Sequence, residues 1–248
     1  FGVEHIFLAG EAPGLFYGYV TQGIVQKEDI TENGIKYIKQ DGSVGYYQTV
    51  NKTTPVAGDV KYVDRNGDGV VDDNDRDIIG NPNPDFTYGF QTKVSWKSLS
   101  LSASFNGVQG RDILNVGNRY NNTPGTKSNN VTRKAFQNMW TDENPSNLYP
   151  KSTFVVQNMV MDRYVEDGSY LRCSDITLSY VLPAKWTNKI GIKNTSVYAS
   201  VKNAFVITDY SGYDPEVNSF AFDGLRPGVD MNSYPTPRSF VFGLNLTF

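Results

Sequence analysis

Apolar and polar residues alternate most strictly between Phe86 and Gly110. The first run, FTYGFQTKVSWK, has apolar residues at most even positions, and the second, LSLSASFNGVQG, has them at odd positions from Leu99 onward. Successive side chains of a strand point to opposite faces, so each run predicts a strand with one apolar and one polar face. A strand of a soluble sandwich would also alternate, but each run has about the ten residues that cross a bilayer at a tilt, with aromatic residues at its ends. The stretch therefore predicts a transmembrane β-hairpin that turns near Ser98.

Three later segments, 174–182, 197–205 and 239–248, show the same alternation. The charged residues within the predicted strands all fall on the polar parity, and they are Lys93, Lys97, Asp175 and Lys202. A charge on the lipid face of a barrel costs roughly 2–4 kcal/mol at mid-bilayer, whereas a charge facing a polar lumen costs little. The pattern therefore predicts an all-β, antiparallel transmembrane sheet of five strands.

The connections between these strands differ greatly in length. Those at Lys97–Leu99 and Pro183–Asn194 are short, whereas 1–84, 111–167 and 207–235 are long. Outer-membrane barrels have short periplasmic turns and long outer loops, so we expect extracellular long loops and a periplasmic C-terminus. We therefore divide the chain into an extracellular loop region, 1–84, and barrel strands, 85–248, with two further outer loops, 111–167 and 207–235. Within 111–167 the sequence VTRKAFQNMWTDENP predicts a short helix that ends before Pro145.

Composition excludes several classes of protein. A mean hydropathy of −0.43 and the absence of a long apolar run exclude a helical membrane protein, but not a barrel, whose strands are half polar. A net charge of −3 gives no electrostatic basis for binding nucleic acid. The single cysteine, Cys173, permits no internal disulfide, and we expect it to be a small packing residue. The single histidine, His5, permits no His-based triad or zinc site, so we expect no enzyme and place His5 in a loop or at an interface. The first residues carry no signal-peptide pattern, which suggests that the polypeptide begins elsewhere.

One segment, DRNGDGVVDDND, carries recognisable chemistry. Its oxygen-bearing residues have the spacing of an EF-hand-type calcium loop, with Gly69 at the sharp turn and apolar Val71 placed to anchor the loop to a core. The predicted ligands of a structural Ca²⁺ are Asp64, Asn66, Asp68, the Val70 carbonyl, Asp72 and Asp75. The flanking residues do not predict two helices, so the loop would lack the EF-hand fold. The alternative is an acidic turn without an ion, because Asp, Asn and Gly are also preferred in turns.

Several blocks, in this order, resemble the C-terminal part of the SusC/RagA family of TonB-dependent outer-membrane transporters. They are a long block from Gly58 to Asn115, WTDENPSNLYP (140–150), DGSYLRCSDITLSYVLP (167–183), VYASVKNAFVITDYSGYDPEVN (197–218) and YPTPRSFVFGLNLTF (234–248). The resemblance implies the last five strands of a plugged barrel of about 22 strands in a Bacteroidota-type outer membrane. It also implies that the partners are the rest of the barrel, a plug, a SusD-like surface lipoprotein and TonB. The chain departs from the family pattern because it contains no plug, TonB box or N-terminal extension.

The resemblance implies import of oligosaccharides or peptides, and no residue selects between the two. The alternative is a SusC-like barrel that serves as a structural or assembly platform without transport. The last outer loop bears aromatic and acidic residues that could stack on a sugar, but we favour packing against the lipoprotein because interfaces are enriched in aromatic residues. They are Tyr210, Tyr213, Phe220, Phe222, Asp214 and Glu216.

Overall fold

A computed structural model describes residues 4–123, 130–152, 159–187, 192 and 194–247. The chain forms two compact units. The first comprises 1–83, 112–166 and 217–233, and the second comprises 84–111, 167–216 and 234–248. None of the helices in the described ranges is both long and apolar enough to cross a membrane.

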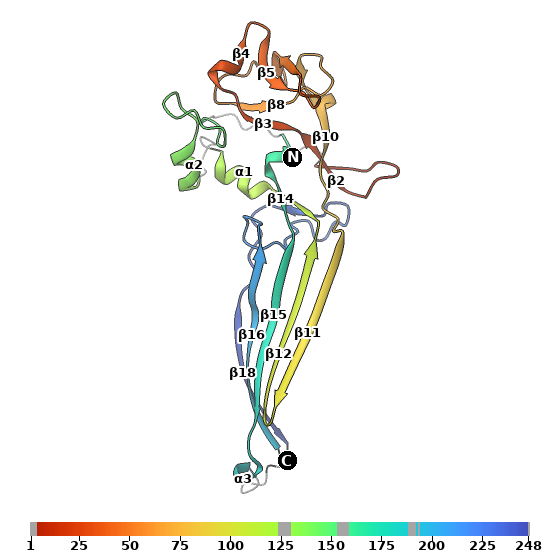
Figure 1. The fold of residues 1–248 in the computed structure, drawn as a ribbon, viewed down its shortest axis with the longest axis vertical. Coiled ribbons are helices and arrows are strands. Elements are labelled where there is room, and N and C mark those ends of the chain that lie inside the picture. The colour runs from red at the N-terminus through yellow and green to blue at the C-terminus, as the bar shows by residue number, and fades with distance from the viewer. Residues whose placement is uncertain (1–3, 124–129, 153–158, 188–191, 193, 248) are drawn as a thin grey trace. The chain divides into compact units, whose positions relative to one another are not determined.

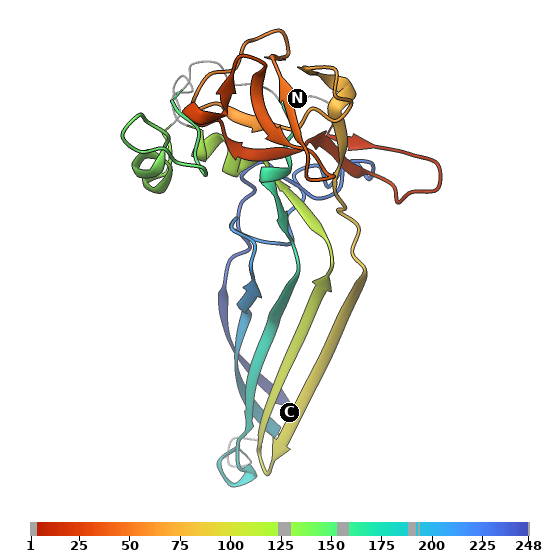
Figure 2. The same cartoon turned by 45° about the horizontal axis from the view of Figure 1, so that its top comes forward.

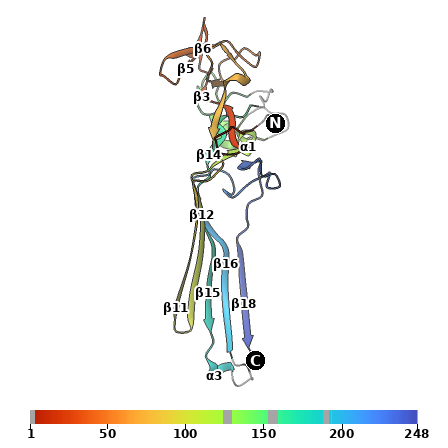
Figure 3. The same cartoon turned by 90° about the vertical axis from the view of Figure 1, so that its right-hand side faces the viewer.

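The second unit is a five-stranded antiparallel sheet in the order β11-β12-β15-β16-β18 (Figure 1). Its strands are β11 (Phe86–Trp96), β12 (Leu99–Gln109), β15 (Tyr170–Val181), β16 (Asn194–Thr208) and β18 (Ser239–Thr247). A four-residue helix, α3 (Ala184–Thr187), follows β15. Figure 3 shows the sheet from the side, with β11 and β18 as its two edges. The structure thus confirms the predicted all-β fold. Strand β15 begins four residues before the predicted segment 174–182, and β16 extends beyond the predicted segment 197–205 at both ends.

Strand register aligns the apolar residues into rows across the sheet. One row runs from Val94 through Leu101, Leu178 and Ala199 to Phe242. A neighbouring row on the same face joins Trp96, Leu99, Tyr180, Val197 and Leu244. Because side chains alternate, the residues between these rows make the opposite face, which is rich in hydroxyl groups. The parity predicted from the sequence is therefore confirmed on all five strands.

A β-bulge at Ser174 interrupts this alternation. Ser104 pairs with Asp175, but the next residue, Phe105, pairs with Cys173, so Ser174 is an extra residue in β15. The Ser174 hydroxyl donates a hydrogen bond to the Ser104 carbonyl at 3.1 Å. An extra residue reverses the parity of the strand beyond it. Arg172 therefore lies on the polar face, although it shares its even number with apolar Ile176.

The first unit is built from short strands in five small sheets, seen for the first 80 residues in red to orange in Figure 2. Its strands are β1 (His5–Ile6), β2 (Leu15–Tyr19), β3 (Thr21–Ile24), β4 (Ile30–Thr31), β5 (Gly34–Ile38), β6 (Val44–Tyr47), β7 (Thr49–Val50), β8 (Val60–Tyr62), β9 (Val70–Val71), β10 (Arg76–Gly80), β13 (Asp112–Asn115), β14 (Val165–Asp167) and β17 (Val229–Asp230). Its helices are α1 (Val116–Asn122) and α2 (Arg133–Asn138), with single 3-10 turns at Lys27–Asp29, Asp73–Asp75 and Asp162–Tyr164. The sequence predicted α2 and missed α1.

A hydrophobic core holds these sheets together. Phe16, Tyr47 and Val71 are fully buried in it, and Met161 and Val229 join from the later segments of the unit. The core therefore draws on all three sequence segments of the unit. The first 84 residues form short antiparallel hairpins, which pack on residues from two later parts of the chain.

Candidate functional site

The predicted calcium loop closes around two buried carboxylates. Asp64 Oδ1 and Oδ2 accept hydrogen bonds from the Gly67 and Gly69 amides at 2.6 and 2.8 Å. Asp75 Oδ1 accepts from the Arg65 amide at 2.7 Å, and its Oδ2 accepts from the Asp72 amide at 2.8 Å. Both carboxylates are almost inaccessible to solvent. The first and last residues of the loop are thus held toward its interior.

Electrostatics at the loop interior disfavour two negative charges. Burial raises the pKa of Asp64, and the nearby Asp75 and Asp68 raise it further, against the lowering effect of the Gly69 and Gly67 amides. Tyr37 donates a hydrogen bond to the Asp64 carbonyl at 2.7 Å, and burial together with the two carboxylates raises the pKa of Tyr37 to about 12. A cation would relieve this repulsion.

The remaining predicted ligands bond within the loop. Asp68 accepts a hydrogen bond from the Val70 amide, Asp72 accepts from the Asn74 amide, and Asn66 accepts from the Asp68 amide, each at 2.8 Å. Among the described residues, no three His, Cys, Asp or Glu side chains meet as a metal-binding group. The donor set is all oxygen, which suits a hard cation, but its carboxylates are turned toward backbone amides. Val71 is fully buried and anchors the loop to the core, as expected.

A second charged cluster lies on the polar face of the five-stranded sheet. Arg172 is only 5% exposed and donates a hydrogen bond to Asp214 Oδ1 at 2.5 Å. Its Nε lies 3.1 Å from Glu216 Oε2, while the Tyr170 hydroxyl donates to Glu216 Oε1 at 2.6 Å. Arg111 adds a hydrogen bond to the Pro215 carbonyl. The cluster therefore ties the segment 214–216 of the last long connection to β15 and to Arg111, two residues after the end of β12.

Asp214 is held ionised within this cluster. Its burial opposes ionisation, but hydrogen bonds from Thr236 and the Glu216 amide, together with the Arg172 charge, outweigh it and lower the pKa of Asp214. Sequence reasoning missed Arg172, because the position of its side chain depends on the bulge at Ser174.

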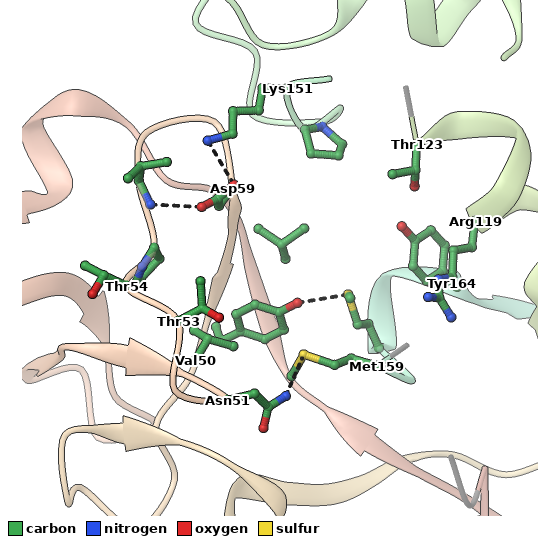
Figure 4. A pocket seen from close by; sticks show the side chains of 16 residues that line it. Val50, Asn51, Thr53, Thr54, Asp59, Arg119, Thr123, Lys151, Met159 and Tyr164 are labelled. Carbon is green, nitrogen blue, oxygen red and sulfur yellow. Dashed lines mark hydrogen bonds and ion pairs between the residues drawn. The ribbon is translucent and has the colours of Figure 1, made fainter. Parts of the chain in front are cut away.

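A pocket of about 590 Å³ opens in the first unit (Figure 4). Five apolar or aromatic residues of its lining are buried: Val50, Tyr62, Met159, Met161 and Tyr164. Methionine side chains adapt to different apolar shapes. The pocket can therefore take an apolar group.

Polar side chains line the same pocket. Lys151 Nζ lies 3.1 Å from Asp59 Oδ1, and Asn51 donates a hydrogen bond to Met159 Sδ at 3.5 Å. On the other side, the buried Arg119 from α1 lies beside Tyr164 (Figure 4). An apolar floor with a few polar groups is typical of small-molecule or side-chain binding sites.

The aromatic residues expected in the last outer loop divide into two groups. Tyr210 is buried, and Phe220 packs beside the core with the Arg226 guanidinium 3.6 Å from its ring centroid. Tyr213 and Phe222 are strongly exposed, at 74% and 86%. Of these four aromatic residues, all within the described part of the chain, only Tyr213 and Phe222 are accessible to a partner.

Two single residues take structural positions. Cys173 is buried, which confirms the expected packing role. It pairs with Phe105 and Phe205, whose rings lie 6.3 Å apart. Of the two positions expected for His5, a loop or an interface, the structure contradicts the loop, because His5 lies in β1, buried against Phe16, with Nε2 2.9 Å from the Pro227 carbonyl. Burial lowers the pKa of His5.

Several known proteins are similar to this chain. TonB-dependent receptor P3 of Formosa agariphila is 33% identical over 98% of the chain and 23% of its own length. TonB-dependent receptor P26 of the same organism is 35% identical over 78% of the chain and 20% of its own length. TonB-dependent receptor SusC of Bacteroides thetaiotaomicron is 34% identical over 75% of the chain and 17% of its own length. No protein-family model matches the chain.

The fold has relatives among solved structures. The RagAB peptide importer in its open-open state superposes with a TM-score of 0.66 at 25% identity, covering 100% of this chain and 24% of the importer chain. The chain therefore spans between 17% and 24% of the length of these relatives, and its five strands form a partial barrel. Its sequence similarity to receptors including SusC and its structural similarity to RagA agree with the two-faced sheet. The chain belongs to the SusC/RagA-like family of TonB-dependent receptors.

Proposed function

We propose that the chain is the barrel-wall and outer-loop part of an outer-membrane importer of oligosaccharides or peptides. The observation that carries this proposal is the sheet whose apolar rows and polar rows occupy opposite faces across all five strands. A lipid-facing apolar surface and a polar lumen require this arrangement. The proposal assigns binding and transport to the chain, and no catalysis.

The same proposal requires partners beyond this chain. The edge strands β11 and β18 each pair on one side only within the described sheet, and unpaired backbone groups are costly in lipid. We assign their missing neighbours to the rest of a closed barrel that surrounds a plug. The similarity to RagAB supports a surface lipoprotein partner of the SusD type, and the similarity to TonB-dependent receptors supports energisation through TonB.

We further propose that the long connections are extracellular and that β18 ends at the periplasmic side, since short turns face the periplasm in such barrels. In this orientation the pocket of the first unit lies outside the membrane, where it can contact an apolar group of the imported oligomer. The exposure of Tyr213 and Phe222 supports a contact of these side chains with the lipoprotein.

We also propose that the loop from Asp64 to Asp75 binds a structural Ca²⁺ at this outer side. Support comes from the spacing of its oxygen ligands and from the two buried carboxylates, whose charges a cation would offset. Asp64, Asn66, Asp68, the Val70 carbonyl, Asp72 and Asp75 would hold the ion. On binding, their carboxylates would give up hydrogen bonds from backbone amides and coordinate the ion instead.

Uptake measurements test the main proposal. The gene for the whole receptor is deleted, and uptake of defined oligosaccharides and oligopeptides is compared with that of cells complemented by the intact gene. We expect loss of uptake for one class of oligomer and its recovery on complementation. The parent strain must first be shown to contain the receptor in its outer membrane. If deletion then leaves uptake of every oligomer unchanged, the structural platform is favoured instead.

A further inference from the structure

Charge is distributed unevenly between the two ends of the five-stranded sheet. The short connections between β11 and β12 and between β15 and β16 contain Lys97, Lys185, Lys189 and Lys193, but no Asp or Glu. The remaining 19 basic residues and all 26 acidic residues lie elsewhere in an acidic chain. The end of the sheet with the short connections is therefore basic, although the whole chain has a net charge of −3.

A hydrogen bond joins the β11–β12 turn to the end of β15, where the second short connection begins. The Val181 amide at the end of β15 donates to the Ser98 carbonyl in the β11–β12 turn at 2.9 Å. Helix α3 begins three residues after Val181 and contains Lys185 and Trp186. Figure 3 shows α3 at the same end of the sheet as the β11–β12 turn. Lys97 and Lys185 are thus presented by adjacent connections.

Two exposed tryptophans accompany these lysines. Trp96 is 68% exposed at the end of the apolar row that it shares with Leu99 and Tyr180, and Trp186 is 66% exposed. The Lys97 ammonium lies 4.8 Å from the centroid of the Trp96 indole. An indole has an apolar body and one N–H donor, so it prefers the boundary between lipid chains and headgroups. In a bilayer the two indoles would therefore place this boundary at the level of the basic connections.

We propose that the surface formed by Trp96, Lys97, Lys185 and Trp186 binds the headgroup phosphates of anionic phospholipid. The occupant follows from charge complementarity, because lysine ammonium groups without acidic neighbours in their connections attract phosphate, and from the apolar face beside them, which takes the acyl chains. A soluble anion would not use the two exposed indoles. Closing the barrel would leave this surface open, since its residues belong to the lipid face and the turns.

This inference rests on the proposed membrane location of the sheet. Its effect should be a preference for anionic lipid in the shell around the protein, worth roughly fivefold in relative association constant for each lysine near the surface. The preference should weaken with salt, because the charges are exposed.

Tryptophan quenching by brominated lipids tests the preference. The full-length receptor is reconstituted in two bilayers of the same phosphatidylglycerol and phosphatidylethanolamine content, in which only one of the two lipids is brominated. We expect brominated phosphatidylglycerol to quench more of the tryptophan fluorescence than its mole fraction in the bilayer predicts. Removing both indoles, by Trp96→Phe with Trp186→Phe, should abolish most of this excess.

Charge variants decide whether the lysines cause the excess quenching by brominated phosphatidylglycerol. Lys97→Gln with Lys185→Gln should bring quenching close to the mole fraction, whereas Lys39→Gln with Lys134→Gln, which removes the same charge from exposed positions of the first unit, should leave the excess unchanged. Quenching that follows mole fraction in the unaltered receptor, or an excess that survives the first pair of substitutions, overturns the inference. Both outcomes require a receptor inserted in the bilayer, so they leave the proposed membrane location standing. A receptor that fails to insert would contradict that location and, with it, the inference.

Discussion

Replacing Arg172 with methionine should release the segment 209–216 from the sheet. The substitution keeps much of the side-chain volume but removes the cation between Asp214 and Glu216. Asp214 is 5% exposed, so its charge would stay buried without its partner. Removing one member of a buried ion pair typically costs about 3–5 kcal/mol, mainly because the other charge is left uncompensated.

The structure places the expected cost at the lower end of this range. Asp214 keeps hydrogen bonds from the Glu216 amide at 2.9 Å and the Thr236 amide at 3.2 Å, and Glu216 is partly exposed. We therefore expect the free energy of local opening to fall by about 3 kcal/mol, which corresponds to roughly a hundredfold faster amide exchange in the segment.

Hydrogen exchange on the full-length receptor measures this opening. The matched control is Lys202→Met, which removes the cation of an ion pair on the same face, because Lys202 lies 2.7 Å from Asp175 but is 53% exposed. Asp175 also keeps hydrogen bonds from Thr177 and Ser200. An exposed pair contributes below about 1 kcal/mol, so exchange in the control should change less than about fivefold. Unchanged exchange in Arg172→Met, or equal changes in both variants, would refute the reasoning.

The same cluster predicts a dependence on pH. The pKa of Asp214 is lower in the folded chain than in the unfolded chain. Its contribution to stability is therefore present above the unfolded value, near pH 4, and is lost as pH falls through the lowered folded value. Protection of 209–216, corrected for intrinsic exchange, should fall only in this acidic range.

Three further experiments test the faces, the loop and the pocket. Leu101→Arg on the apolar face should cost roughly 2–4 kcal/mol and reduce the receptor recovered in the outer membrane, whereas Ser102→Arg on the polar face should leave recovery nearly unchanged, and equal recovery would contradict the assigned faces. Calcium at millimolar concentration should slow amide exchange in 64–75 in the unaltered receptor and not in Asp64→Asn, with an affinity on the order of 10⁻⁴ to 10⁻³ M, and the absence of slowing in both would remove the ion from the proposal. Thr53→Trp, which places an indole in the pocket, should weaken uptake, while the neighbouring Lys52→Trp, outside the pocket lining, should not, and unchanged uptake in both would remove the pocket from the transport path.

Local pattern was sufficient to predict the sheet. The alternation in β11 and β12 depends only on residues two apart, and the register of the hairpin then follows from its tight turn, so Val94 and Leu101 had to share a face. The remaining rows follow because β15, β16 and β18 alternate in the same way. The calcium-type loop was equally visible, since its spacing lies within one short segment.

The core of the first unit and the cluster around Arg172 depend instead on contacts between residues far apart in the sequence. The core of the first unit joins Phe16 to Met161 and Val229, which no periodicity in the first 84 residues could indicate. Arg172 carried no sequence signal either, since its numbering parity assigned it to the apolar face. The only hint was the pair Cys173–Ser174. The apolar residues lie at odd positions up to Cys173 and at even positions after Ser174.

The bulge at Ser174 lets β15 hold one residue more than β12 over the same paired stretch. Deleting Ser174 would therefore remove the bulge and leave the faces as they are, with Arg172 and Tyr170 on the polar face and Cys173 on the apolar face. Flattening the bulge with its residue still in place would have the opposite effect, because Arg172 would then face the acyl chains. A single-codon deletion at 174 should thus permit assembly, whereas a strand that keeps all its residues depends on the bulge to hold the charged cluster on the polar face.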